Sequence, residues 1–182
     1  MEELSIIKDY KMKLDYTACH AGSENLVATL TVDRDLTDLL PYINATAEKA
    51  KYISKLNWIK FNFRGFPEKY KGKPWTVAIQ GETVSIRSFV EKDTANKISE
   101  ECIKYINDII LQREQIEPSY KEWKQPKAID IFKYLPKSNC KKCGFSTCMA
   151  FAAKLALDEV SLADCSELVL DSENYIKISE ML

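Results

Sequence analysis

The chain of 182 residues contains one histidine and five glycines, and these shortages exclude several kinds of catalytic site. A pair of histidine ligands is impossible with His20 alone, and a serine–histidine–aspartate triad would have to use that same residue. The glycines form neither a dinucleotide-binding loop of the G-x-G-x-x-G type nor a Walker phosphate loop. Basic and acidic residues nearly balance, at 26 and 27, so the charge offers no support for nucleic-acid binding.

Long apolar runs are missing as well. No stretch approaches the roughly 18 consecutive apolar residues that a membrane span requires, and residues 1–5 lack the basic start of a signal peptide. We therefore expect no membrane span and a cytoplasmic location. Disulfides are rare in that compartment, because its thiols stay reduced.

Four of the six cysteines lie near the C-terminus, in the spacing C-x2-C-x4-C-x16-C. They are Cys140, Cys143, Cys148 and Cys165. Four thiolates gathered in this way can hold a metal centre, and both iron–sulfur clusters and structural zinc select cysteine ligands. Structural zinc usually shows two C-x2-C pairs, whereas only one is present here. The spacing favours an iron–sulfur cluster, and structural zinc stays open as the alternative.

The residues between these cysteines also suit a metal site. Gly144 follows Cys143 at a point where the backbone needs either a positive φ or a close approach to the cluster. Ser146 or Thr147 can cap a helix that begins at about Cys148. A thiolate in the first turn of a helix lies at the positive end of the helix dipole, which favours the charged form that binds metal.

The stretch LPKSNCKKCGFSTCMAFAAKLA (135–156), with Cys165 beyond it, resembles the short four-cysteine [4Fe–4S] domain of the large subunit of the corrinoid iron–sulfur protein. It is also similar to the cluster domain in the B subunit of the Rnf electron-transport complex. The resemblance covers about residues 128–170. The chain differs from the family at Ser146, a position where proline is common. The whole chain resembles small iron–sulfur cluster-domain proteins with a leading α+β portion.

This resemblance implies one [4Fe–4S] cluster, bound by the four cysteines, that takes part in one-electron transfer. It also implies a redox partner, such as a ferredoxin or a corrinoid protein, in anaerobic metabolism. The chain would then be a redox carrier, or an accessory subunit of a corrinoid or other anaerobic redox enzyme. Four cysteine ligands leave no open iron position, which favours electron transfer over a stand-alone enzyme. The alternative is a non-redox interaction module held together by structural zinc.

Three further features have both a plain and a functional interpretation. For the adjacent Cys19 and His20 a loop without ligands is favoured over a metal site. Cys102 lies on the apolar face of a predicted helix and is most simply a core residue. Lysines gather around the cysteines, and either they form an ordinary solvated surface, which is favoured, or they offset the charge of a cluster and steer an acidic partner. These lysines are Lys133, Lys137, Lys141 and Lys142.

The fold class we expect is α+β. An N-terminal sheet with helices on one face should occupy residues 1–115, and a linker with Pro118 and Pro126 should follow over 116–127. A small, mostly helical cluster-binding domain should form residues 128–182. The hydrophobic core of a domain of that size gives little stability by itself, and a bound metal cluster can supply the additional cross-link.

Periodicity predicts the individual elements of the α+β domain. Strands are expected over 5–16, 25–32, 58–63, 75–80 and 83–90, with Gly81-Glu82 as a hairpin turn. Helices are expected over 35–53, where Pro41 begins or bends the helix, and over 93–114, where Asp93 can provide the cap. The buried stripe of the second helix should contain Ile98, Cys102, Ile106, Ile109 and Ile110.

Overall fold

The computed structural model describes residues 6–16, 26–64, 74–89 and 91–182. The chain divides into two compact units, residues 1–123 and 124–182, and each has a hydrophobic core of its own. Cys19 and His20 lie outside the described residues, so the interpretation of that pair stays a prediction. No helix in the described ranges combines the length and apolar character needed to cross a membrane.

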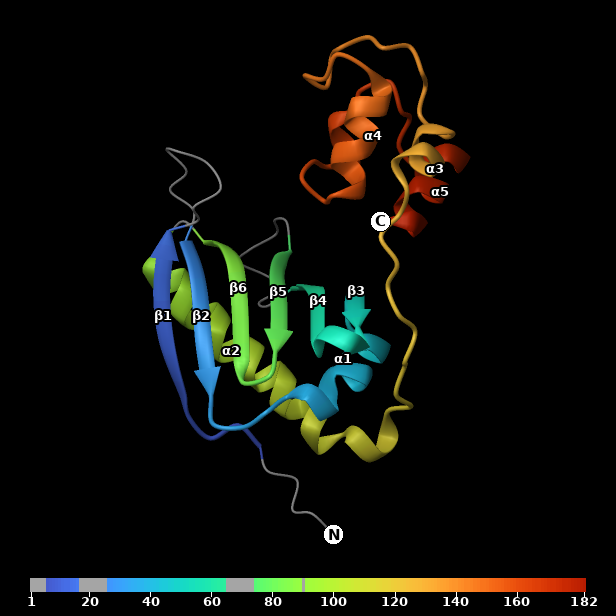
Figure 1. Cartoon of the computed structure of the whole chain (residues 1–182). Coiled ribbons are helices and arrows are strands. Elements are labelled where there is room, and N and C mark those ends of the chain that lie inside the picture. Colours follow the sequence, from blue (N-terminus) through green and yellow to red (C-terminus); the bar gives the residue numbers. More distant parts are fainter. Residues whose placement is uncertain (1–5, 17–25, 65–73, 90) are drawn as a thin grey trace. The chain divides into compact units, whose positions relative to one another are not determined.

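The first unit is built on a six-stranded sheet whose neighbouring strands are all antiparallel (Figure 1). Its strand order is β1-β2-β6-β5-β4-β3. The strands are β1 (Tyr10–Tyr16), β2 (Leu26–Val32), β3 (Glu48–Ile53), β4 (Trp58–Phe63), β5 (Trp75–Gln80) and β6 (Thr83–Phe89).

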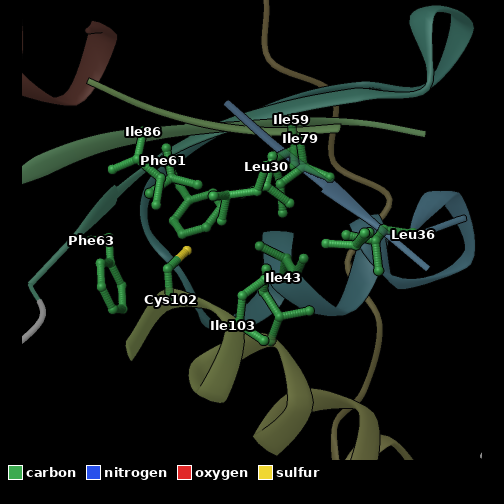
Figure 2. Packing of buried hydrophobic residues seen from close by; sticks show 14 of the residues in the cluster. Leu30, Leu36, Ile43, Ile59, Phe61, Phe63, Ile79, Ile86, Cys102 and Ile103 are labelled. Carbon is green, nitrogen blue, oxygen red and sulfur yellow. The ribbon is translucent and has the colours of Figure 1, made fainter. Parts of the chain in front are cut away.

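Alternation along the strands explains which face of the sheet carries the core. In β4 every second side chain is buried, and Ile59 pairs with Ile79 of β5 while Phe61 pairs with Val77. Successive side chains of a strand point to opposite faces, so these apolar residues form one continuous surface. Figure 2 shows that surface, with Ile59, Phe61 and Ile79 labelled.

Two helices cover that same face, and the predicted α+β class with helices on one side of the sheet is confirmed. They are α1 (Leu40–Thr46) and α2 (Lys92–Leu111). In Figure 2, Ile43 of α1 and Cys102 and Ile103 of α2 point toward the sheet. The predicted stripe of α2 is buried throughout. Cys102 is fully buried, and this burial raises the pKa of its thiol to about 12, as suits a core residue rather than a reactive one.

The predicted helix over 35–53 is wrong in its second half. A short 3-10 turn, η1 (Thr37–Leu39), leads into α1, which ends at Thr46, and residues 48–53 form the edge strand β3. The backbone turns extended at Ala47, and Tyr52 then pairs with Ile59 of β4 and buries its ring. Pairing with β4 and burial of Tyr52 therefore override the helical spacing of the preceding leucines.

Other predicted boundaries need smaller changes. Pro41 lies at the start of α1, where a fixed φ and a missing N–H are tolerated. The N-cap of α2 is Glu91 rather than Asp93, which lies within the first turn. A 3-10 turn, η3 (Arg113–Gln115), follows the end of α2. The hairpin turn is as predicted, and Gly81 has the positive φ of 56° that such turns require.

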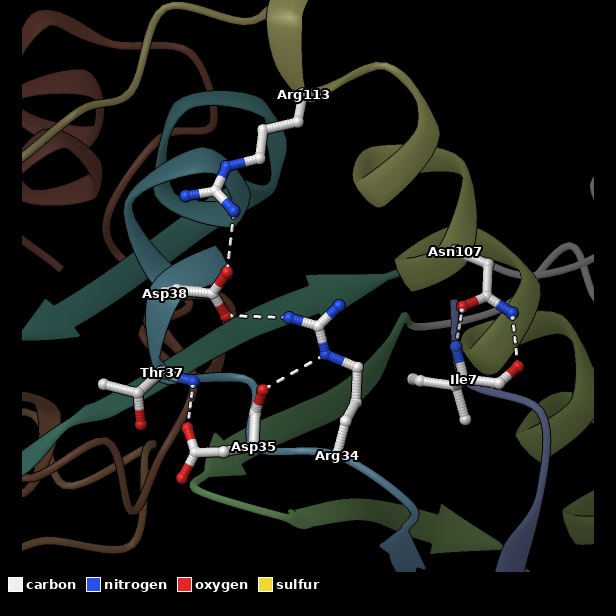
Figure 3. A network of polar contacts seen from close by, with 7 residues as sticks. All are labelled: Ile7, Arg34, Asp35, Thr37, Asp38, Asn107 and Arg113. Atoms are coloured by element: carbon white, nitrogen blue, oxygen red, sulfur yellow. Dashed lines mark hydrogen bonds and ion pairs between the residues drawn. The ribbon is translucent and has the colours of Figure 1, made fainter. Parts of the chain in front are cut away.

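A polar network ties the end of α2 to the start of α1 (Figure 3). Asp38 accepts from Arg34 at 3.0 Å and from Arg113 at 2.7 Å, and the Arg113 guanidinium lies 4.7 Å from the centre of the Tyr42 ring. The Asp35 carboxylate accepts the backbone N–H of Thr37 at 2.7 Å. These contacts hold the end of α2 against the start of α1 within the first unit.

The segment after η3 runs along the first unit. The backbone N–H of Ser119 donates to the Pro41 carbonyl, and that of Trp123 donates to the Tyr52 carbonyl, each at 2.9 Å. Asn44 holds the same segment through the Ser119 carbonyl, at 2.8 Å. The boundary between the units therefore falls between residues 123 and 124, inside the predicted linker.

Candidate metal centre

The second unit contains three short segments that carry the four predicted ligands. Its elements are α3 (Ala128–Phe132), α4 (Cys148–Ala156), the 3-10 turn η4 (Leu162–Asp164) and α5 (Glu173–Met181). Cys140 and Cys143 lie in the loop before α4, Cys148 is the first residue of α4, and Cys165 directly follows η4. The helices pack around Ile131, Phe151 and Ile178, all of them buried.

The loop with the C-x2-C pair has an unusual backbone. Lys137, Asn139 and Lys141 have φ between 51° and 62°, a region that side chains other than glycine rarely adopt. Gly144 has φ of 84°, and its N–H closes a turn on the Lys141 carbonyl at 3.0 Å. A Cβ on Gly144 would meet no protein atom within 4 Å. The predicted positive φ is therefore present at Gly144.

The start of α4 is fixed by two side-chain hydrogen bonds. Thr147, rather than Ser146, is the N-cap, because its hydroxyl accepts the N–H of Ala150 at 3.1 Å. Asn139 reaches across from the C-x2-C loop and accepts the N–H of Cys148 at 2.8 Å. The Cys148 thiol consequently lies in the first turn of a capped helix.

Cys165 is positioned by a turn with its own cap. Ser161 and Asp164 form a reciprocal capping box around η4. Burial raises the pKa of the Cys165 thiol, backbone N–H groups that follow it act in the opposite direction, and the neighbouring Cys143 and Cys148 raise it further. Cys165 lines the same hollow as Cys143 and Cys148.

All four predicted cysteines line a single hollow, and the structure brings the complete set together. Their thiols are free, and two of them, Cys148 and Cys165, are only 8% exposed. Phe145 and Phe151 form an apolar wall, with ring centres 5.8 Å apart. The remaining lining residues are Ser138, Asn139, Lys141, Thr147 and Ser166.

The donor set fits an iron–sulfur group. Four thiols, half-shielded by apolar side chains, are the environment in which such clusters are bound. In the described ranges no three cysteine, histidine, aspartate or glutamate side chains converge closely enough to hold a single metal ion. The four thiols line one hollow.

Comparisons with known proteins agree with this assignment. Residues 135–166 match a family model described as "Putative Fe-S cluster". The chain is also similar to subunit gamma of the acetyl-CoA decarbonylase/synthase complex. Over 54 residues it is 43% identical to that subunit from Archaeoglobus fulgidus, and over 61 residues 55% identical to that from Methanocaldococcus jannaschii. The site thus lies within the segment that matches the iron–sulfur family model.

The similarity is local. It covers 30% and 32% of this chain, and only 12% of each of these two relatives. No solved structure matches the chain. The segment that matches the family model, residues 135–166, lies in the second unit and contains the four cysteines.

The structure also places a residue at the site that the sequence did not indicate. The Glu167 carboxylate accepts from the Ser138 hydroxyl and forms an ion pair with Lys142 at 3.2 Å. Hydrogen bonds from Ser138 and Lys142, with a smaller contribution from Cys140, hold the pKa of Glu167 below its ordinary value. The sequence shows only an acidic residue two positions after Cys165, because partners 25 and more residues apart leave no periodic signal.

Proposed function

We propose that the chain transfers single electrons through one [4Fe–4S] cluster bound by Cys140, Cys143, Cys148 and Cys165. The observation that carries this proposal is the gathering of four free thiols around one hollow, within the segment that matches the iron–sulfur family model. When bound, such a cluster supplies a centre that takes up and releases one electron at a time. The chain would act as a carrier or an accessory subunit, not as an enzyme by itself.

The cysteine spacing and the family model favour a cluster over zinc. Structural zinc usually shows two C-x2-C pairs, whereas the four cysteines here contain one, within the segment that matches the iron–sulfur family model. Structural zinc in a non-redox interaction module remains the alternative function, and metal analysis separates the two.

The residues around the hollow have separable roles in this proposal. Phe145 and Phe151 keep water from one side of the thiolates and so lower the local dielectric constant. Lys141 is exposed and also lines the hollow, so its positive charge favours an added electron. The predicted lysine cluster is otherwise partly neutralised, since Lys133 pairs with Asp130 and Lys142 with Glu167.

The partner we propose is an acidic redox protein, a ferredoxin or a corrinoid protein, in the cytoplasm of an anaerobe. Two observations support a partner of this kind. Lys141 offers a positive charge at the site, and the relatives are named as subunits of the acetyl-CoA decarbonylase/synthase complex. The resemblance to the corrinoid iron–sulfur protein and to the Rnf subunit points the same way.

Electron paramagnetic resonance of the full chain, purified without oxygen, tests the proposed function. Brown protein that bleaches with dithionite and then gives the signal of a reduced one-electron cluster is the expected result. Colourless protein with one zinc per chain would establish the alternative.

The partner is tested separately by Lys141→Glu. Because association with an acidic protein is steered by charge, this variant should exchange electrons with a ferredoxin several-fold more slowly at low salt, and the difference should shrink as salt is added. Lys124→Glu is the matched control, because Lys124 is also exposed but does not line the hollow. Equal rates for the two variants would remove the role of Lys141.

A further inference from the structure

Three polar side chains join the first and the last of the ligand-bearing segments. One oxygen of the Glu167 carboxylate accepts a hydrogen bond from the Ser138 hydroxyl. The other oxygen accepts one from the Lys142 ammonium, at 3.2 Å. Ser138 and Lys142 lie two residues on either side of Cys140, and Glu167 lies two residues after Cys165. We call Ser138, Lys142 and Glu167 the polar clasp.

Asn139 makes the corresponding connection to the third segment. Its side-chain oxygen accepts the N–H of Cys148, while the neighbouring Ser138 holds Glu167. Two adjacent side chains of one loop therefore contact both of the other ligand-bearing segments. The connection is made by protein groups alone.

We propose that Glu167 is a positioning residue, whose contacts with Ser138 and Lys142 hold Cys165 against the C-x2-C loop and so retain the cluster. This inference rests on the proposed function for its ligand, but the clasp itself consists of contacts between protein side chains. Glu167 does not itself line the hollow, it has a weaker contact with Cys140 besides Ser138 and Lys142, and its side chain is 28% exposed.

The position of Glu167 makes the contact effective. Cys165 and Leu168 are joined by a turn, in which the N–H of Leu168 donates to the Cys165 carbonyl at 3.1 Å, and Leu168 is buried in the core of the second unit. The backbone at residue 167 therefore cannot shift without moving Cys165 or withdrawing Leu168 from that core. A contact made by the Glu167 side chain therefore helps to hold the turn that carries Cys165.

The charge of the clasp is also balanced. A carboxylate two residues from a thiolate would repel it, and pairing with Lys142 offsets that repulsion. The hydroxyl and the ammonium each contact a different oxygen of the carboxylate. The clasp can therefore close the site without adding a net negative charge.

Iron release from the cluster-loaded full chain tests the clasp. Glu167→Gln keeps the size of the side chain and removes its charge, and it should speed iron release to a chelator by about tenfold, the scale of one lost charge-assisted hydrogen bond. Lys142→Gln should have a similar effect. The double variant should release iron no faster than the worse single one, because both substitutions break the same contact.

Glu173→Gln is the matched control. Glu173 pairs with Lys177 at 2.5 Å on α5, so this variant removes a lysine–glutamate pair of the same unit that does not line the hollow. It should release iron at the rate of the unmodified chain. The inference is overturned if Glu167→Gln matches Glu173→Gln, or if the Glu167 and Lys142 effects multiply in the double variant.

A second readout separates failure of the clasp from failure of the proposed function. In the metal-free, reduced full chain, mass spectrometry can follow alkylation of each cysteine by iodoacetamide. Cys165 should react about tenfold faster in Glu167→Gln than in the unmodified chain or in Glu173→Gln, whichever metal the site takes. Equal reactivity of Cys165 in all three would overturn the clasp, while zinc in place of iron would overturn only the proposed function.

Discussion

Replacing Cys165 by alanine should abolish cluster binding while leaving the first unit intact. Cys102→Ala is the matched control, because both residues are buried cysteines that lose the same sulfur atom. Cys165 lines the hollow, whereas Cys102 belongs to the core of the first unit. The pair therefore separates the loss of a ligand from the loss of packing.

The size of the effect follows from the number of ligands. Structural zinc bound by four side chains has apparent binding free energies of about 10–16 kcal/mol, so an even share is about 2.5–4 kcal/mol per ligand. On that scale Cys165→Ala lowers affinity by roughly 60-fold to 700-fold. The packing cost of one lost sulfur is smaller, about 1–2 kcal/mol, and applies to both variants.

Iron and acid-labile sulfide per chain, measured after anaerobic purification, are the assay. Cys165→Ala should contain little of either, and Cys102→Ala should contain as much as the unmodified chain. Urea unfolding should show the loss in the second unit for Cys165→Ala and in the first for Cys102→Ala. Full iron and sulfide in Cys165→Ala would refute the ligand assignment, and equal losses in both variants would attribute the effect to packing.

Three further changes test local parts of the structure. Thr147→Ala removes the cap of α4 and should cost the second unit about 1 kcal/mol in urea unfolding, whereas Ser146→Ala should cost nothing measurable. Gly81→Ala places a Cβ at a φ of 56° and should destabilise the first unit by about 1–2 kcal/mol, with no effect on iron content. The pKa of Asp35 is lowered by its hydrogen bonds with Thr37. The stabilisation of the folded first unit by the Asp35 carboxylate is therefore fully present above the ordinary carboxyl pKa, and it is lost as the pH falls through the lowered value. Asp35→Asn should therefore reduce the acid sensitivity of thermal unfolding of the first unit, and an unchanged pH profile would contradict this.

Much of the fold could be predicted because its signals are local. The alternation in β4, the glycine at the β5–β6 turn and the apolar stripe of α2 each depend on neighbouring residues only. The candidate site could also be read from spacing, since four cysteines within 26 positions of one another are a strong pattern. The structure adds that they line one hollow.

The features that could not be predicted depend on partners distant in the chain. Residues 48–53 follow a run of helically spaced leucines, and pairing with β4 makes them a strand. Likewise, Glu167 looks like any surface glutamate until Ser138 and Lys142 are brought to it. Sequence patterns report periodicity within an element, and these contacts lie between elements.

The most direct test of the account is the metal content of the full chain prepared without oxygen. We predict about four iron and about four sulfide per chain, with zinc near zero, as one [4Fe–4S] cluster on four cysteines requires. A folded preparation with one zinc and neither iron nor sulfide would contradict the central claim.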